Sequence, residues 1–97
     1  MASSLLFKEY ILNQLKGLDN ITCKPMMGEF LLYYNGTLFG GIYDDRFLIK
    51  KTKTNAKYSL LEEIPYENAK PMYMVENTDN ISFLETIIKE TCTDLKK

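Results

Sequence analysis

Apolar residues recur at spacings of three and four near both ends of the chain, the pattern of helices that bury one face. Near the N-terminus they are Leu5, Leu6, Tyr10, Ile11, Leu15 and Leu18. A serine at position 3 or 4 can cap this helix and Gly17 suits a left-handed end, so we expect it over about residues 4–17. Near the C-terminus a helix capped by Asp79 or Asn80 carries the second stripe, which comprises Ile81, Leu84, Ile88 and Leu95.

Short apolar segments alternate with turn residues in the middle of the chain, which predicts strands. Strands over about residues 29–34 and 37–43 are joined by Asn35-Gly36. This dipeptide favours a hairpin, because a type I′ turn needs positive φ at both central residues. Asp44-Asp45 makes a second tight connection, which leads into a strand over about residues 46–51.

The flanking segments predict further strands and one more helix. Residues 21–24 read as a short first strand, followed by a proline that must lie at an edge or a bend. We expect a short helix over residues 55–63, capped by Thr54 or Asn55 and ended by Pro65. A loop over residues 64–70 and a strand over 72–75 follow. The order α-β(3-4)-α-β-α predicts an α+β fold, with two layers and helices packed on one face of an antiparallel sheet.

Two-residue loops in both hairpins would pair Tyr34 with Thr37 and Tyr43 with Arg46, and regular alternation then sorts the side chains onto two faces. The face expected under the helices carries Leu31, Tyr33, Leu38, Gly40, Ile42, Phe47 and Ile49. The opposite face carries Phe30, Leu32, Phe39, Gly41 and Leu48, with a rim of Tyr34, Thr37, Tyr43, Arg46 and Lys50.

An apolar centre with a rim of tyrosines and cations is typical of a contact surface. The residues that we expect to contact a protein partner are Phe30, Leu32, Tyr34, Phe39, Tyr43, Arg46 and Leu48. A homodimer is the simplest such partner. The alternative is that a helix or loop of the same chain covers this face.

Composition and charge narrow the class of protein. The 97 residues suit one domain, 45% of them are hydrophobic, and the net charge of -1 argues against strong non-specific binding to nucleic acid. No apolar run is long enough for a membrane helix, and the N-terminus lacks the basic start of a signal peptide. Cys23 and Cys92 form no Cys-x-x-Cys pair, so we expect two free, buried thiols and a cytoplasmic protein.

The residue types needed for catalysis do not assemble into a set. The chain has no histidine, which excludes catalytic triads and imidazole acid–base chemistry. Gly40-Gly41 lies inside a strand without the spacing of a phosphate loop, and its expected purpose is close packing. Asp44-Asp45 supplies too few oxygens for a hard cation and is better explained as a turn. We therefore expect no enzyme activity, no cofactor, no metal and no small-molecule substrate.

A basic segment stands out against the overall charge. Within twelve residues without an acidic side chain lie Arg46, Lys50, Lys51, Lys53 and Lys57. These cations predict a patch that could bind an anionic partner, either nucleic acid or an acidic protein segment. The alternative is structural, because lysines near a strand end also prevent edge-to-edge aggregation.

One pattern resembles a known family. It reads Met26-x-Gly28-Glu29-Phe30-x-Leu32-Tyr33-x-Asn35-Gly36-x-x-Phe39-x-x-Ile42-x-Asp44-Asp45-x-x-x-Ile49-Lys50, and Pro71-Met72-x-x-Val75 follows it. It resembles the TfoX N-terminal domain, named after the bacterial Sxy/TfoX regulators of natural competence. The sequence departs from the family at Met27, where Phe is usual, and at Leu31, where Gly is common. The resemblance implies a two-layer α+β domain like that of the type III secretion chaperones, here expected as a single domain over residues 1–97 without the regulators' C-terminal helical domain.

The leading functional hypothesis is a non-catalytic protein-interaction domain that is regulatory in transcription or competence. One alternative is a transcriptional co-regulator that touches nucleic acid or polymerase through the basic patch. The other is a chaperone-like module that captures an extended peptide on an exposed edge strand.

Overall fold

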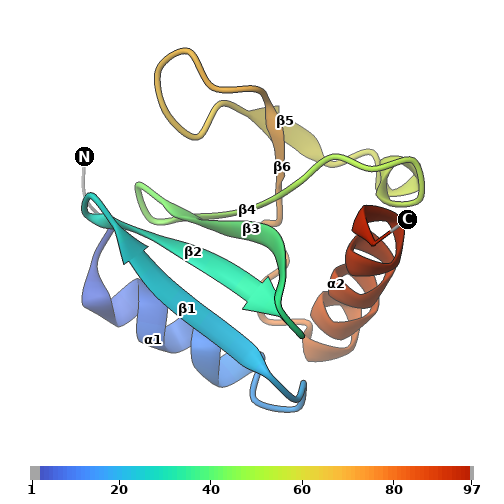
Figure 1. The fold of residues 1–97 in the computed structure, drawn as a ribbon, viewed down its shortest axis with the longest axis horizontal. Coiled ribbons are helices and arrows are strands. Elements are labelled where there is room, and N and C mark those ends of the chain that lie inside the picture. Colours follow the sequence, from blue (N-terminus) through green and yellow to red (C-terminus); the bar gives the residue numbers. More distant parts are fainter. Residues whose placement is uncertain (1–2, 97) are drawn as a thin grey trace.

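The computed structural model describes residues 3–96, which form an α+β domain with a helix at each end of the chain (Figure 1). The helices are α1 (Leu5–Gln14), the 3₁₀ helix η1 (Asn55–Tyr58) and α2 (Ile81–Leu95). The strands are β1 (Ile21–Met26), β2 (Glu29–Tyr34), β3 (Thr37–Tyr43), β4 (Arg46–Ile49), β5 (Leu61–Glu63) and β6 (Met72–Met74). The expected α+β class is confirmed, but the expected order with a third α-helix is wrong.

The six strands form one antiparallel sheet in the order β1-β2-β3-β4-β6-β5. Tight turns with positive φ at both central residues join the first four strands, at Met27-Gly28, Asn35-Gly36 and Asp44-Asp45. The last two of these turns were expected. The first was missed, and β1 therefore continues through Pro25, which is tolerated because β1 is an edge strand.

The helix expected over residues 55–63 ends after a single 3₁₀ turn. Ser59 adopts a left-handed conformation with φ 53°, which breaks the helix. Leu61, Glu62 and Glu63 then pair with Met74, Tyr73 and Met72. Pairing with β6 satisfies the backbone of this segment, and Pro65 further on disfavours helical backbone at the residue before it.

A β-bulge in β3 changes which residues share a face. Leu32 pairs with Gly40, whereas Tyr33 pairs with Leu38, so Phe39 is an extra residue on β3. The expected pairs Tyr34–Thr37 and Tyr43–Arg46 are confirmed. The regular alternation drawn from them is wrong, because one inserted residue reverses the faces on one side of the bulge.

Both helices pack against one face of the sheet, and the bulge decides what that face contains. The buried core residues from the helices and the segment after α1 are Ile11, Leu15, Leu18, Leu84, Ile87, Ile88 and Cys92. Those from the sheet and its flank are Leu32, Phe39, Ile42, Phe47, Ile49, Tyr73 and Val75. Each α-helix begins at an expected cap, since Ser4 Oγ accepts from the Phe7 amide and Asn80 Oδ1 from the Phe83 amide.

Candidate functional site

An open groove of about 760 Å³ lies over the outer sheet face, and Leu95 at the C-terminal end of α2 also contributes to its lining. Its sheet side is formed by Met26, Leu31 and Leu38, which belong to β1, β2 and β3 and lie outside the helix-packed core. Its other side is the loop over residues 64–71, which leaves the sheet between β5 and β6 (Figure 1). The groove therefore lies between regular sheet and an irregular segment, next to the C-terminal end of α2.

Arg46 fixes the loop to the start of β4. Its Nη1 lies 2.8 Å from Glu63 Oε1, and its Nη2 donates to the carbonyl oxygens of Ile64 and Pro65 at 3.3 and 3.5 Å. The Arg46 Nε also donates to the Tyr43 carbonyl oxygen at 3.1 Å. One guanidinium thus joins two strands and the loop.

Tyrosine packing supports the same contact between β3 and the loop. The rings of Tyr43 and Tyr66 lie 6.0 Å apart, within the range of favourable aromatic pairs. Burial, followed by the neighbouring Tyr66 and Glu29, raises the pKa of the Tyr43 phenol. Tyr43 is buried, whereas Tyr66 is 57% exposed. Tyr66 therefore presents an aromatic surface at the edge of the groove.

Charged groups in the groove are all positive. Lys50, Lys51 and Lys70 line it, and its lining contains no Asp, Glu or Cys. Lys51 Nζ lies 3.0 Å from Glu62 Oε1 and also stacks over the Tyr73 ring. Within residues 3–96, no carboxylate lies at ion-pair distance from the amines of Lys50 and Lys70. The groove is thus apolar with unneutralised cationic charge.

The contact face expected from the sequence does not form as one surface. Leu32 and Phe39 are buried in the helix-packed core, and Phe30 and Tyr34 pack against that core. Tyr43 pairs with Arg46 and Leu48 pairs with Gly41, on the outer side of the sheet as expected. Tyr43 and Leu48 are buried, however, with 5% and 0% of their surface exposed.

Sequence reasoning missed the residues that do line the outer face. They are Met26, Leu31, Leu38 and Met72, together with the loop residues Pro65, Tyr66, Ala69, Lys70 and Pro71. Gly40-Gly41 was the available signal, because glycine inside a strand often marks a bulge. A loop that packs back on the sheet leaves no comparable periodic pattern.

A comparison with protein-family models shows which family the chain belongs to. The model of the TfoX N-terminal domain matches residues 13–85, which run from α1 into α2 and include every strand. The chain belongs to the TfoX N-terminal domain family. The resemblance carried by the turns and core residues is thereby confirmed. No curated protein matches the chain in a sequence comparison.

The basic patch expected on this TfoX N-terminal domain is divided among different contacts. Arg46 pairs with Glu63, Lys51 with Glu62 and Lys57 with Glu90. Lys50 lines the groove, and Lys53 is exposed outside it. The five cations therefore do not act as one unneutralised surface.

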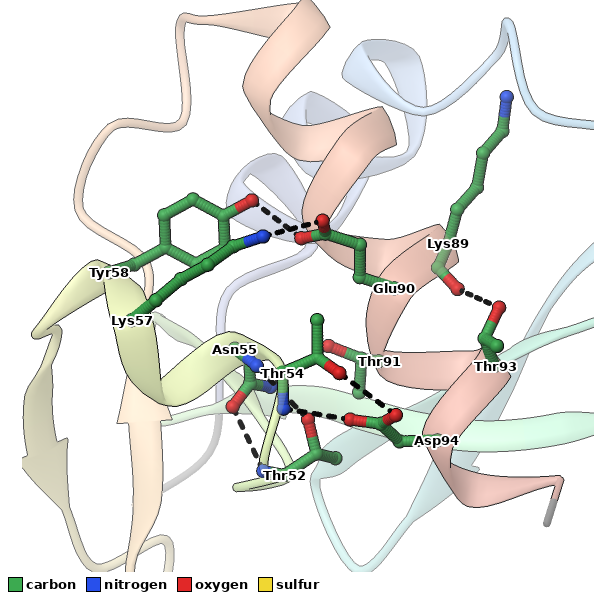
Figure 2. A network of polar contacts seen from close by, with 10 residues as sticks. All are labelled: Thr52, Thr54, Asn55, Lys57, Tyr58, Lys89, Glu90, Thr91, Thr93 and Asp94. Atoms are coloured by element: carbon green, nitrogen blue, oxygen red, sulfur yellow. Dashed lines mark hydrogen bonds and ion pairs between the residues drawn. The ribbon is translucent and has the colours of Figure 1, made fainter.

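The segment that follows Lys50 is fixed to α2 by a polar network (Figure 2). Asn55 is completely buried, and its Nδ2 donates to the Lys50 carbonyl oxygen at 2.8 Å and to Thr91 Oγ1 at 2.9 Å. The Asn55 Oδ1 accepts from the Thr52 amide at 2.9 Å. Thr54 donates from its amide and hydroxyl to Asp94, each at 2.9 Å. These bonds hold the η1 segment against the helix.

A second, half-buried part of this network involves Glu90. Its Oε1 accepts from the Tyr58 hydroxyl at 2.5 Å, and its Oε2 lies 2.9 Å from Lys57 Nζ. These two bonds, with that from Tyr58 the larger cause, lower the pKa of Glu90. The same bonds raise the pKa values of Tyr58 and Lys57. The network binds η1 to α2 and does not face the groove.

The titratable groups give no sign of an activated nucleophile. Both cysteines are free, as expected, although Cys23 is only partly buried. Burial raises the pKa of Cys92 to about 11 and also raises that of Cys23, so both remain thiols at neutral pH. Residues 3–96 contain no cluster of three side chains suited to hold a metal ion. No helix in the described part of the chain is long and apolar enough to cross a membrane.

Proposed function

We propose that this TfoX N-terminal domain is a non-catalytic protein-interaction module that binds its partner in the groove on the outer sheet face. The observation that carries the proposal is the groove's lining. Met26, Leu31, Leu38 and Met72 remain partly exposed there, next to a core in which comparable side chains are fully buried. Apolar side chains gathered in a concave surface are typical of binding sites.

A regulatory role suits this module. Kinship with the Sxy/TfoX regulators suggests that the bound protein acts in transcription or natural competence, in a cytoplasmic setting. Fold and family alone do not determine function, so the partner has to be found by experiment. A second copy of the chain is one candidate for that partner.

The two alternative functions have less support in the structure. Direct binding of nucleic acid through the basic patch is disfavoured because Arg46, Lys51 and Lys57 are engaged in ion pairs. Capture of a peptide on edge strand β1 is disfavoured because Lys24 and Pro25 lie on that strand. Lysine and proline are residues that protect strand edges from pairing.

Site-directed photocrosslinking in cells that express the protein tests the proposal. A photoreactive amino acid at Leu38, inside the groove, should give a discrete protein adduct, whereas one at the exposed Thr86 of α2 should not. A second substitution, Leu31→Asp, should remove the adduct from position 38 while the circular dichroism spectrum stays unchanged. Light scattering of the purified protein distinguishes a second copy from another protein.

Equal labelling from positions 38 and 86 would refute the groove as the binding site. The same holds if the Leu31→Asp variant is folded and gives an undiminished adduct. In either case the exposed apolar residues of the groove would have no part in recognition.

A further inference from the structure

We infer that the groove takes an acidic protein segment whose apolar side chains lie on the sheet and whose carboxylates meet Lys50 and Lys70. The inference rests on the proposed function and names the chemistry of its partner. It is argued from three features of the outer face, namely the sign of its charge, the positions of its cations and the character of its apolar surface.

The sign of the charge is opposite to that of the chain as a whole. The protein has 13 acidic and 12 basic residues, yet the groove lining contains three lysines and no carboxylate. Glu62 neutralises Lys51 at 3.0 Å, which leaves Lys50 and Lys70 as groove cations without an ion-pair partner in the described chain. Complementary charge is a major source of specificity at interfaces.

The cations flank the apolar surface on two sides. Ile49 pairs with Tyr73, so the antiparallel register brings Lys50 close to the start of β6, where Lys70 also lies. At the other edge of the sheet, on β1, Lys24 pairs with Leu31. The Lys24 amine lies 5.1 Å from the centre of the Tyr33 ring. A segment lying across Leu31 and Leu38 would thus have cations near both of its sides.

The apolar surface favours protein over nucleic acid. The sheet side of the groove is formed by aliphatic and thioether side chains, and Tyr66 is its one well-exposed aromatic residue. Single-stranded nucleic acids bind to several aromatic rings along a continuous cationic track. Leucine and methionine side chains instead accommodate the apolar side chains of a peptide.

Titration with defined peptides, followed by amide chemical shifts, tests the inference. The probe is a short soluble peptide in which Glu alternates with Leu, and the comparison peptides carry Lys or Ser in place of Glu. The Glu peptide should bind most tightly, with shifts at Leu31 and Leu38 and with affinity that falls as salt rises. Single-stranded DNA and phosphatidylserine vesicles are titrated in parallel.

A pair of charge reversals provides the matched control. The double variant Lys50→Glu and Lys70→Glu should weaken binding of the Glu peptide by about tenfold. Lys16→Glu with Lys53→Glu changes the net charge equally at exposed sites outside the groove and should leave binding within about twofold. Lys50→Gln with Lys70→Gln should weaken binding to an intermediate degree, which guards against misfolding of the reversed variant.

Three results would overturn the inference. Equal or tighter binding of the Lys peptide would remove the acidic character of the partner, while the crosslink from Leu38 would still support the proposed function. Tighter binding of DNA or vesicles, with the same lysine dependence, would assign the groove to nucleic acid or lipid. No binding of the Glu peptide refutes the inference, and the absence of a crosslink refutes the proposed function as well.

Discussion

Gly40 lies where β3 passes very close to β4. A Cβ at this position would meet the carbonyl oxygen of Leu48 and would lie 2.8 Å from the Cα of Ile49. Both atoms belong to the backbone, so no change of rotamer can relieve the contact. At Gly41 a Cβ would meet the Phe30 carbonyl oxygen, so two consecutive residues have no room for a side chain. This is the segment that accommodates the extra residue Phe39.

The substitution Gly40→Ala should therefore destabilise the domain by about 2–3 kcal/mol, because the strands must move apart to admit one methyl group. Urea unfolding measures the effect. Gly17→Ala is the matched control, since its Cβ would meet only the end of the flexible Glu85 side chain. That variant should stay within about 1 kcal/mol of the wild type. Equal midpoints for the two variants would contradict the close approach of β3 and β4.

At the residue scale, the sequence identified Gly40-Gly41 as a point of close packing but did not identify what packs against it. Gly40-Gly41 was predicted to allow close packing, and it does, but the neighbours are strand backbones. The two turn-adjacent pairs of the hairpins were also predicted correctly from Asn35-Gly36 and Asp44-Asp45. The bulge at Phe39 was not, because alternation of apolar residues reads the same on both sides of an insertion when both faces are apolar.

At the scale of elements, η1 is held against α2 by a buried polar side chain, that of Asn55. The four residues of η1 are too few for a stable isolated helix, and their position depends on α2. The side-chain amide of Asn55 makes three bonds, to the Lys50 carbonyl oxygen, the Thr52 backbone amide and Thr91 Oγ1, and the last of these connects η1 to α2. All of these groups would lose a partner if the amide were removed.

Replacement of Asn55 by Ala should cost about 2–4 kcal/mol of unfolding free energy, because it leaves buried polar groups unsatisfied. Thr93→Ala is the control, since its exposed hydroxyl donates only to the Lys89 carbonyl within the same helix. Thermal unfolding followed by circular dichroism compares the two variants. A loss for Asn55→Ala no larger than that for Thr93→Ala would show that the network adds little stability.

The segment over residues 55–63 marks the limit of prediction for elements. A short helix was expected over the whole segment, and only its first four residues are helical, as the 3₁₀ helix η1. The rest was expected as helix because Leu60, Leu61 and the glutamates are compatible with either structure. The left-handed Ser59 and the pairing partner β6, which lies ten residues or so downstream, decide in favour of a strand. Tertiary pairing of this kind is not visible in local sequence.

At the scale of the whole molecule, the loop over residues 64–71 is connected to the sheet chiefly through Arg46. Of its residues only Pro65 is buried, so apolar packing contributes little to its position. The Arg46–Glu63 pair is partly screened, with side chains 24% and 34% exposed. The same guanidinium also donates to the Ile64 and Pro65 carbonyl oxygens. Because the loop is mostly exposed and depends on these few contacts, its local opening should need less free energy than global unfolding.

Arg46→Ala should release the loop while leaving most of the global stability intact, with a loss of about 1 kcal/mol. Hydrogen exchange at Ala69, whose amide donates to the Tyr66 carbonyl oxygen at 3.0 Å, should become faster. Lys57→Ala removes an ion pair of similar length from η1 and should leave exchange at Ala69 unchanged. Unaltered exchange in Arg46→Ala would mean that other contacts hold the loop.

The overall architecture was predictable to the level of class and family, whereas the candidate site was not. Turns, caps and the two helical stripes are local signals, and they gave the antiparallel sheet and its covering helices. The groove depends on a single inserted residue in β3, for which Gly40-Gly41 is the one local signal, and on a loop that returns to the sheet, which leaves no local signal. Lys50 and Lys51 were noticed in the sequence, although only the fold separates Lys50 from the paired cations around it.

The attachment of the loop through one arginine has a consequence for divergence within the family. Substitutions, insertions or deletions between β5 and β6 would change the side of the groove that the loop forms and would leave the hydrophobic core unchanged. Relatives could thereby acquire different binding preferences at little cost to foldability. Variation concentrated in this short stretch, beside a constant scaffold, would be the trace of such specialisation.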